Sequence, residues 1–261
     1  MDVSLNGKRA IVCGSTQGIG KASAIELALL GASVTLIARD EEKLRAVMKE
    51  LPGKGNQKHD FIVADFNDAM VLQEKVSVYA GGYAVHILVN NTGGPPAGAV
   101  FDAPLREFTQ AFSNHLLCNH ILVQAFVPGM KKEKYGRIIN VISTSVKTPL
   151  KGLGVSNTIR AAVANWAKTL SMEVAPFGIT VNNVLPGSIM TGRLESLLQS
   201  RAEKTGRTYE QVLQEMIHEI PAGRIGEAKE TAAAIAFLAT PAAAYINGIN
   251  IPVDGGRTAC L

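Results

Sequence analysis

The sequence predicts one doubly wound α/β domain over residues 1–261, a parallel seven-stranded sheet with helices on both faces. Short apolar runs alternate with longer helical patterns along the whole chain, and a glycine-rich turn directly follows the first apolar run. Such alternation requires right-handed crossovers, and therefore a parallel sheet that helices cover on both sides. No linker rich in Pro, Gly or Ser and no internal repeat divides the chain, so we expect a single domain.

Seven runs predict the strands, and six stretches between them predict the helices. The strands are expected at Arg9–Cys13, Ser33–Ala38, Phe61–Ala64, His86–Val89, Arg137–Ile142, Thr180–Leu185 and Asn250–Pro252. Several are apolar almost throughout, as strands that are buried on both faces must be. The helices are expected at Ile19–Leu30, Glu41–Leu51, Ala69–Ala80, Leu105–Met130, Ser156–Ala175 and Ala228–Leu238.

The segment from Ser188 to Gly226 interrupts this alternation. Within it, Arg193–Arg201 and Tyr209–Glu219 predict two short helices. A segment that follows a late strand of an open α/β sheet lies over the ligand crevice at the carboxyl ends of the strands. We therefore interpret residues 188–226 as a helical substrate lid, with a solvated helical excursion as the alternative.

Composition limits the classes of partner. The 26 Lys and Arg against 22 Asp and Glu leave a net charge of +4, without the clustered basic residues that nucleic-acid binding favours. Cys13, Cys118 and Cys260 lie far apart, which argues against a disulfide framework or a zinc site and favours a reducing compartment. We find neither a signal-peptide core nor an apolar stretch long enough to span a bilayer. We expect a cytoplasmic protein with no metal, no nucleic acid and no membrane partner.

A glycine-rich turn, Gly14-Ser-Thr-Gln-Gly18-Ile-Gly20, joins the first predicted strand to the first predicted helix. Glycine permits a tight turn and leaves room for a pyrophosphate, and the helix N-terminus supplies unpaired N–H groups and a positive dipole end. Three residues, rather than the usual one, separate the first two glycines. The strand–turn–helix context nevertheless predicts a dinucleotide cofactor at this turn.

The end of the second predicted strand discriminates between the two nicotinamide cofactors. A carboxylate there would bind the adenosine 2′-hydroxyl of NAD(H), whereas an Arg accepts the 2′-phosphate of NADP(H). Ala38 ends the strand and Arg39 follows it. Asp40 is the counter-argument, but it precedes Glu-Glu-Lys-Leu, and we interpret it as the N-cap of the next helix. The sequence therefore favours NADP(H) over NAD(H).

Along its whole length the sequence resembles the short-chain dehydrogenase/reductase family. The glycine turn is similar to that family's cofactor turn, Asn90-Asn-Thr-Gly93 resembles its Asn-Asn-Ala-Gly motif, and Asn140-Val-Ile-Ser143 resembles the strand that ends in its catalytic Ser. Within the family the likeness is to 3-oxoacyl-(acyl-carrier-protein) reductases. The resemblance implies a Rossmann fold, hydride transfer between NADP(H) and a small-molecule carbonyl or acyl thioester, and a homo-oligomer, either a tetramer or a dimer.

The resemblance also implies the site residues. Asp65 corresponds to an Asp that contacts the adenine, and the loop from Pro186 to Thr191 corresponds to one that holds the nicotinamide carboxamide. Ser143 is the implied catalytic Ser, and Asn114 the Asn that holds a proton-relay water. The implied cofactor residues are Gly14, Ser15, Gln17, Gly18, Ile19, Gly20, Arg39, Asp65, Phe66, Asn91, Gly93, Arg160, Pro186, Gly187, Ile189 and Thr191.

The family's catalytic Tyr and Lys are replaced in this sequence. The family has a Tyr thirteen residues after the Ser and a Lys four residues later, and counting from Ser143 gives Ser156 and Arg160. A phenol has a pKa of about 10, which a nearby cation can bring towards physiological pH, whereas an aliphatic hydroxyl is a far poorer acid. Arg160 shares a helix face with Ser156 and provides a fixed cation for ribose hydroxyls, but it cannot shuttle a proton.

Three hypotheses remain open. The protein is an NADP(H)-dependent oxidoreductase for a carbonyl or alcohol substrate, with an atypical proton donor; or a catalytically impaired NADP(H)-binding protein, a sensor or the silent subunit of an oligomer; or it catalyses another reaction, such as epimerisation or dehydration, on the same scaffold. Under the first hypothesis Ser143 polarises the carbonyl and water is the final proton source. Tyr209, Lys147 and Lys151 are weaker candidates for the donor.

We assign two histidines and an alanine-rich helix face to packing or to an interface. We interpret His115 and His120 as packing or interface residues, because His115 follows Asn114 and points in a different direction on the helix. The small residues Ala161, Ala162, Ala164 and Ala167 would let two copies of this helix pack closely across a two-fold axis. An intramolecular core explains the same alanines.

Overall fold

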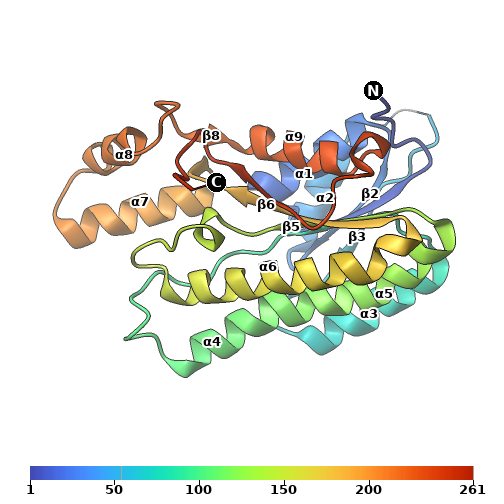
Figure 1. Ribbon diagram of the computed structural model, residues 1–261, viewed down its shortest axis with the longest axis horizontal. Helices are drawn as coiled ribbons and strands as arrows, with labels where there is room; N and C mark the ends of the chain where they lie inside the picture. The colour runs from blue at the N-terminus through green and yellow to red at the C-terminus, as the bar shows by residue number, and fades with distance from the viewer. Residues whose placement is uncertain (54, 261) are drawn as a thin grey trace.

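A parallel seven-stranded sheet forms the centre of the computed structural model, which describes residues 1–53 and 55–260 (Figure 1). All six strand pairs are parallel, and the order across the sheet is β3-β2-β1-β4-β5-β6-β9. The doubly wound α/β fold predicted from the sequence is confirmed. The strands are β1 (Arg9–Cys13), β2 (Ser33–Ala38), β3 (Asp60–Val63), β4 (Ile87–Asn90), β5 (Gly136–Val141), β6 (Ile179–Pro186) and β9 (Asn250–Val253).

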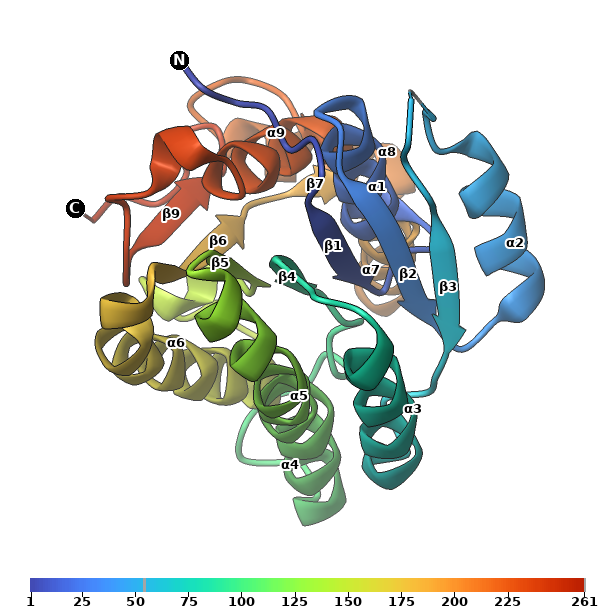
Figure 2. The same cartoon turned by 90° about the vertical axis from the view of Figure 1, so that its right-hand side faces the viewer.

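Helices cover both faces of the sheet (Figure 2). Helices α1 and α9 pack together on one face, and the layer with α3, α5 and α6 covers the other. Ile11 and Val12 are both fully buried, each in the core of a different face, which explains why the strands are continuously apolar. The helices are α1 (Gly18–Leu29), α2 (Glu41–Glu50), α3 (Ala69–Gly82), α4 (Leu105–Phe112), α5 (Cys118–Glu133), α6 (Gly154–Val174) and α9 (Ala228–Leu238).

The strand order reverses between β1 and β4, which lie side by side in the middle of the sheet. Ligands of open α/β sheets bind at such a switch point, outside the carboxyl ends of the strands. Gly14 follows β1 and Asn91 follows β4. The fold therefore places the glycine turn and the Asn-Asn-Thr-Gly motif on the two sides of this crevice.

The long helix predicted over Leu105–Met130 is interrupted. A π-helical turn, Ser113–Leu117, separates α4 from α5. Such turns insert a residue into the helix and change the direction of the side chains around it. Within the turn, Asn114 is half-buried and His115 is buried. The apolar periodicity of the sequence carries no sign of this turn, so the single-helix prediction is wrong here.

The insertion at residues 188–226 forms the two helices that the sequence predicts, α7 (Gly192–Thr205) and α8 (Tyr209–His218). Gly206 joins them with φ of 63°, a left-handed conformation that favours glycine. Their apolar faces form a small core of their own, and Figure 1 shows the pair extending beyond the edge of the sheet layers. A short ladder of β7 (Ile189–Met190) with β8 (Gly226–Glu227) closes the base of the insertion. Within the described residues, no helix has both the length and the apolar character needed to cross a membrane.

Candidate functional site

The glycine turn after β1 tolerates no side chain at two of its positions. A Cβ atom on Gly20 would lie 2.2 Å from the main-chain oxygen of Gly14, and one on Gly14 would lie 2.6 Å from the main-chain oxygen of Asn91. Gly14 and Gly18 also adopt φ values of 58° and 54°, where side chains are unfavourable. The spacing of these glycines is therefore a requirement of the local backbone.

Two of the predicted cofactor residues hold this turn in place. The side-chain amide of Asn91 donates to the main-chain oxygens of Cys13 and Gly14, at 3.2 Å each. The buried Ser15 hydroxyl donates to the oxygen of Ile37 at 3.4 Å. The turn is thus fixed to β4 on one side and to β2 on the other, before any ligand binds.

The N-terminus of α1, directly behind the turn, has no capping side chain. Gln17 occupies the N-cap position without a side-chain hydrogen bond, and the first turn has no acidic residue. By contrast, the carboxylates of Asp40 and Asp68 cap α2 and α3. Free amide groups and the positive end of the helix dipole favour an anion at α1.

Thr191 faces this helix end from the base of the insertion. Its methyl carbon would lie 3.1 Å from a Cβ atom on Gly18, and it is also the N-cap of α7. The unpaired amide donors at the N-terminus of α1 therefore lie close to Thr191. Unpaired amide donors at a helix N-terminus are groups that can hold an anion such as a pyrophosphate.

The remaining predicted cofactor residues lie at the same edge of the sheet, because each follows the carboxyl end of a strand. Arg39 follows β2 and is exposed, and Asp40 caps α2 by accepting from the amide of Lys43 at 3.0 Å, as expected. Asp65 and Phe66 follow β3, and Gly187 follows β6. A Cβ atom on Gly187 would lie 2.6 Å from the Cβ of Asp254, so this loop requires glycine too. The edge gathers Gly14, Arg39, Asp65, Phe66, Asn91, Gly93, Ser143, Pro186, Gly187, Ile189 and Thr191.

Ser143 lies two residues beyond the end of β5 and is half-buried. Its Oγ accepts a hydrogen bond from the amide of Ser145 at 3.1 Å. Accepting this bond leaves the hydroxyl proton free to be donated, and polarisation along a hydrogen-bond chain strengthens such a donor. Ser156 is also half-buried and lies in the first turn of α6.

Arg160 is buried beneath this edge, with 8% of the residue exposed. Its Nη1 donates to the main-chain oxygen of Val141 at 2.9 Å, and its Nη2 donates to that of Thr92 at 3.5 Å. Nε is buried and has no partner among the described residues. Burial, together with the nearby positive charge of Arg193, lowers the pKa of Arg160 to about 10, so the guanidinium is charged at neutral pH.

His115, Thr92 and Arg160 form a hydrogen-bonded cluster that the sequence pattern does not predict. Its Nδ1 forms a hydrogen bond with the hydroxyl of Thr92, whose carbonyl oxygen accepts from Arg160. Burial and then the charges of Arg160 and Arg193 lower the pKa of His115 to about 2. The imidazole is therefore neutral at physiological pH. The interpretation of His115 as a packing residue is incomplete, because the π-helical turn directs its ring towards Thr92.

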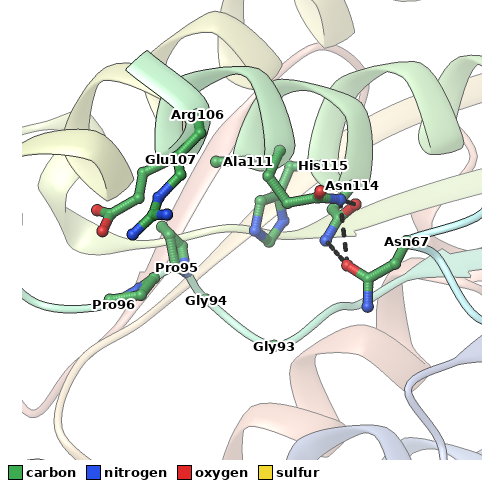
Figure 3. A pocket seen from close by; sticks show the side chains of 11 residues that line it. Asn67, Gly93, Gly94, Pro95, Pro96, Arg106, Glu107, Ala111, Asn114 and His115 are labelled. Carbon is green, nitrogen blue, oxygen red and sulfur yellow. Dashed lines mark hydrogen bonds between the residues drawn. The ribbon is translucent and has the colours of Figure 1, made fainter. Parts of the chain in front are cut away.

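The Asn114 side chain forms hydrogen bonds outside the cluster of Arg160, Thr92 and His115. Its side-chain amide contacts those of Asn67 at 2.9 Å and Gln110 at 2.7 Å (Figure 3). It lines a cavity of about 410 Å³ between α4 and the segment 93–96. No hydrogen bond joins the Asn114 side chain to Ser143, Ser156 or Arg160 among the described residues. The other lining residues are Asn67, Gly93, Gly94, Pro95, Pro96, Arg106, Glu107, Gln110, Ala111 and His115.

A ladder of four asparagine side chains crosses the sheet beside Ser143. Asn90, Asn140, Asn183 and Asn250 occupy paired positions on β4, β5, β6 and β9. Each donates its amide to the next, at 2.8, 2.9 and 2.8 Å. The ladder fixes the register of the strand that precedes Ser143.

Comparison with known proteins agrees with this geometry. The sequence model of a family described as Enoyl-(Acyl carrier protein) reductase matches residues 14–258. The chain is 36% identical over 253 residues to the 3-oxoacyl-[acyl-carrier-protein] reductase FabG of Haemophilus influenzae, covering 97% of this chain and 98% of the relative. The chain belongs to the short-chain dehydrogenase/reductase family.

Two further known proteins are similar to this chain in sequence or in fold. The NADPH-dependent reductase BacG of Bacillus subtilis is 29% identical over 256 residues, covering 97% of this chain and 98% of the relative. The crystal structure of L-sorbose reductase from Gluconobacter frateurii, complexed with NADPH and L-sorbose, superposes with a TM-score of 0.93 at 28% identity. That superposition covers 100% of both chains.

Proposed function

We propose that the protein is an NADP(H)-dependent oxidoreductase acting on a carbonyl or alcohol substrate, similar to 3-oxoacyl-(acyl-carrier-protein) reductases, with an atypical proton donor. The observation that carries the proposal is the uncapped N-terminus of α1 behind the glycine turn, with Thr191 close to Gly18. Ser143 lies at the same edge of the sheet with a hydroxyl proton free to donate.

The preference for NADP(H) over NAD(H) rests on the end of β2. Arg39 is exposed there and forms no ion pair among the described residues, while Asp40 is engaged by Lys43 at 2.9 Å. The neighbouring carboxylate is therefore not directed at a 2′-hydroxyl, and a guanidinium is available for a 2′-phosphate. When bound, the cofactor supplies or accepts the hydride.

The chemistry at the substrate differs from that of a Tyr-Lys pair. Ser143 holds the substrate oxygen by a hydrogen bond and polarises the carbonyl. Arg160 is a fixed cation whose Nη1 and Nη2 already donate to main-chain oxygens, so it stabilises negative charge at this edge but transfers no proton. We propose that water delivers the final proton, because a serine at position 156 is too weak an acid to do so.

A panel of ketones and 3-oxoacyl thioesters tests this proposal with NADPH oxidation as the readout. Turnover that falls at least about a hundredfold in Ser143→Ala, in line with loss of a donor to a developing oxyanion, supports direct polarisation by Ser143. Ser196→Ala, on the exposed face of α7, is the matched control and keeps the parent rate. An unchanged rate in Ser143→Ala contradicts the assigned role.

A second candidate function is a catalytically impaired NADP(H)-binding protein, a sensor or the silent subunit of an oligomer. The buried, main-chain-bonded Arg160 and the short side chain of Ser156 favour it, because neither can take part in a proton relay of the usual kind. Tight NADPH binding without turnover at any pH supports this candidate. Activity created by Ser156→Tyr together with Arg160→Lys would show that this pair is what limits the native site.

We further propose a single domain in which residues 188–226 act as a substrate lid. The lid interpretation is supported by two contacts, of Thr191 with Gly18 and of Arg193 with Pro95. Tyr209 packs against the small core of the insertion, which argues against its role as a proton donor. Limited proteolysis with and without NADPH tests whether the ligand protects this segment.

We also propose a homo-oligomer, either a dimer or a tetramer. Phe101 is 96% exposed and Leu105 is 85% exposed beside α4, and apolar side chains exposed to this degree favour an interface. Ala164 and Ala167 are buried within the chain, so they serve intramolecular packing. Analytical ultracentrifugation of the parent protein and Leu105→Glu tests this assignment.

The unpaired cysteines support a reducing compartment such as the cytoplasm.

A further inference from the structure

Two arginines from different helices bind the same short segment of chain. Arg160, on α6, donates to the main-chain oxygen of Thr92. Arg193, on α7, donates through Nη2 to the main-chain oxygen of Pro95 at 2.6 Å. Its guanidinium also lies against Gly94, since a Cβ atom there would be 3.1 Å from Nη2. The segment 92–95 therefore carries two guanidinium groups within a few residues of each other.

Neither guanidinium has a counter-charge. Within residues 1–53 and 55–260 no ion pair involves Arg160 or Arg193, whereas Arg201 and Arg207, on or beside the same α7, both pair with Glu215. Arg160 is buried, whereas Arg193 is exposed. A buried cation without an anionic partner is costly, and such a group calls for a ligand or a catalytic role. The unpartnered Nε of the nine-tenths-buried Arg160 is the clearest sign of this deficit.

Among residues 1–53 and 55–260, no Asp or Glu forms an ion pair with either arginine. His115 is the titratable group bonded to this segment, and it is neutral. Glu107 lines the neighbouring cavity from α4 but pairs with neither arginine. Two guanidinium groups without ion pairs thus contact the segment 92–95, and Arg160 also donates to the main-chain oxygen of Val141, two residues before Ser143. Around the buried Arg160, the low local dielectric strengthens the attraction for an anion.

We propose that Arg193 binds a carboxylate of the substrate, with Arg160 contributing the second positive charge. The substrate class is then an oxo acid or the corresponding hydroxy acid, whose carbonyl or hydroxyl faces Ser143 while its carboxylate faces the segment 92–95. The assignment of the reacting group rests on the proposed function; the binding of the carboxylate does not.

Cofactor phosphates are the other source of negative charge near this segment. The structure provides separate positions for them, at the uncapped N-terminus of α1 and at the exposed Arg39. Arg193, however, lies only two residues beyond Thr191, which faces the glycine turn. The experiment therefore has to measure cofactor binding and carboxylate binding separately.

Isothermal titration calorimetry of the protein saturated with NADP⁺ makes this distinction, because the oxidised cofactor cannot reduce a ketone during the titration. The probes are pyruvate, acetoacetate and 4-oxopentanoate, each paired with its methyl ester. We expect at least one acid to bind about tenfold or more tightly than its ester, as a charge-assisted hydrogen bond provides. Arg193→Gln abolishes that preference, and Arg201→Gln, on the same helix, preserves it.

Three results would overturn the proposal. One is equal affinity of each acid and its ester, or no binding of any acid at millimolar concentration. Another is an acid preference that persists in Arg193→Gln. The third is a loss of NADP⁺ affinity in Arg193→Gln as large as the loss of acid affinity, which assigns Arg193 to a cofactor phosphate. Since binding is the readout, absence of ketone reduction contradicts the proposed function without deciding this inference.

Discussion

The guanidinium of Arg160 donates to the main-chain oxygen of Val141 at 2.9 Å, two residues before Ser143. Through its other terminal nitrogen the same side chain reaches Thr92, which is bonded in turn to His115. Arg160 therefore ties the end of β5 to the loop after β4 and to the π-helical turn. Under the proposed function, Arg160 is a fixed cationic support that transfers no proton.

Gly20→Ala tests the glycine turn. The added Cβ would meet the oxygen of Gly14 at 2.2 Å, so the turn must shift, and overpacking of this kind costs about 1–3 kcal/mol. We expect NADPH affinity, measured by fluorescence titration, to fall by about tenfold or more for a shift of that energy.

Gly129→Ala is the control for this substitution. Gly129 lies inside α5, and a Cβ atom there meets nothing within 4 Å. Because Ala is a better helix former than Gly, we expect this variant to gain up to about 1 kcal/mol of stability in urea unfolding and to bind NADPH normally. Normal NADPH binding by Gly20→Ala would show that the turn is not the phosphate site.

Arg39→Ser tests the choice of cofactor. Removal of the guanidinium takes away the group proposed to bind the 2′-phosphate, so we expect the Kd for NADPH to rise by about tenfold and the Kd for NADH to stay the same. Arg45→Ser is a suitable control, because Arg45 is exposed on α2 and paired with Glu41. An equal change in the Kd for NADPH and the Kd for NADH would show that Arg39 does not bind the 2′-phosphate.

The sequence predicts the sheet well because its strands are buried on both sides. Ile11 and Val12 face opposite cores, which makes β1 a continuous apolar run that only a covered parallel strand explains. The glycine turn is predictable for a similar reason, since the clash at Gly20 is local and depends on the adjacent backbone. The N-cap role of Asp40 follows from its neighbours in the chain.

The cluster around Arg160 is not predictable in the same way, because it depends on contacts between distant segments. His115 meets Thr92 across 23 positions, and Arg160 meets Thr92 across 68. The π-helical turn decides that His115 rather than Asn114 faces this cluster, and a regular helical periodicity does not reveal such a turn. The fold is therefore predictable from local sequence patterns, whereas the contacts of Arg160, Thr92 and His115 are seen only in the folded chain.

Asn140→Ala tests the asparagine ladder. Asn140 is fully buried and bonded to both Asn90 and Asn183, so truncation leaves a donor and an acceptor without partners. We expect a loss of about 2–4 kcal/mol in urea unfolding, since each unsatisfied buried group costs about 1–3 kcal/mol. Asn250→Ala removes only the last bond of the ladder and should cost about 1 kcal/mol. Equal losses in the two variants would contradict the ladder as a unit that fixes the strand register.

The low pKa of His115 predicts a specific dependence of stability on pH. Burial lowers this pKa to about 2 in the folded protein, whereas an unfolded histidine titrates near pH 6.5, at about its ordinary value. Below that pH the unfolded chain binds a proton that the folded chain does not, so the unfolding free energy falls as the pH falls. Well below pH 6.5 this slope approaches about 1.4 kcal/mol per pH unit, and the stability contribution of His115 is complete about one pH unit above 6.5.

Urea unfolding between pH 7 and pH 5 measures this slope. His115→Gln removes the titrating group, so near pH 5 the slope should decrease by about one proton, or about 1.4 kcal/mol per pH unit. A residual slope is expected from His86, whose pKa is also lowered, chiefly by burial. Thr92→Val is the matched control, because it removes the hydrogen bond but leaves the buried imidazole in place. That variant should be less stable than the parent protein and keep its slope. Equal slopes in His115→Gln and the parent would show that His115 carries a proton in the folded state.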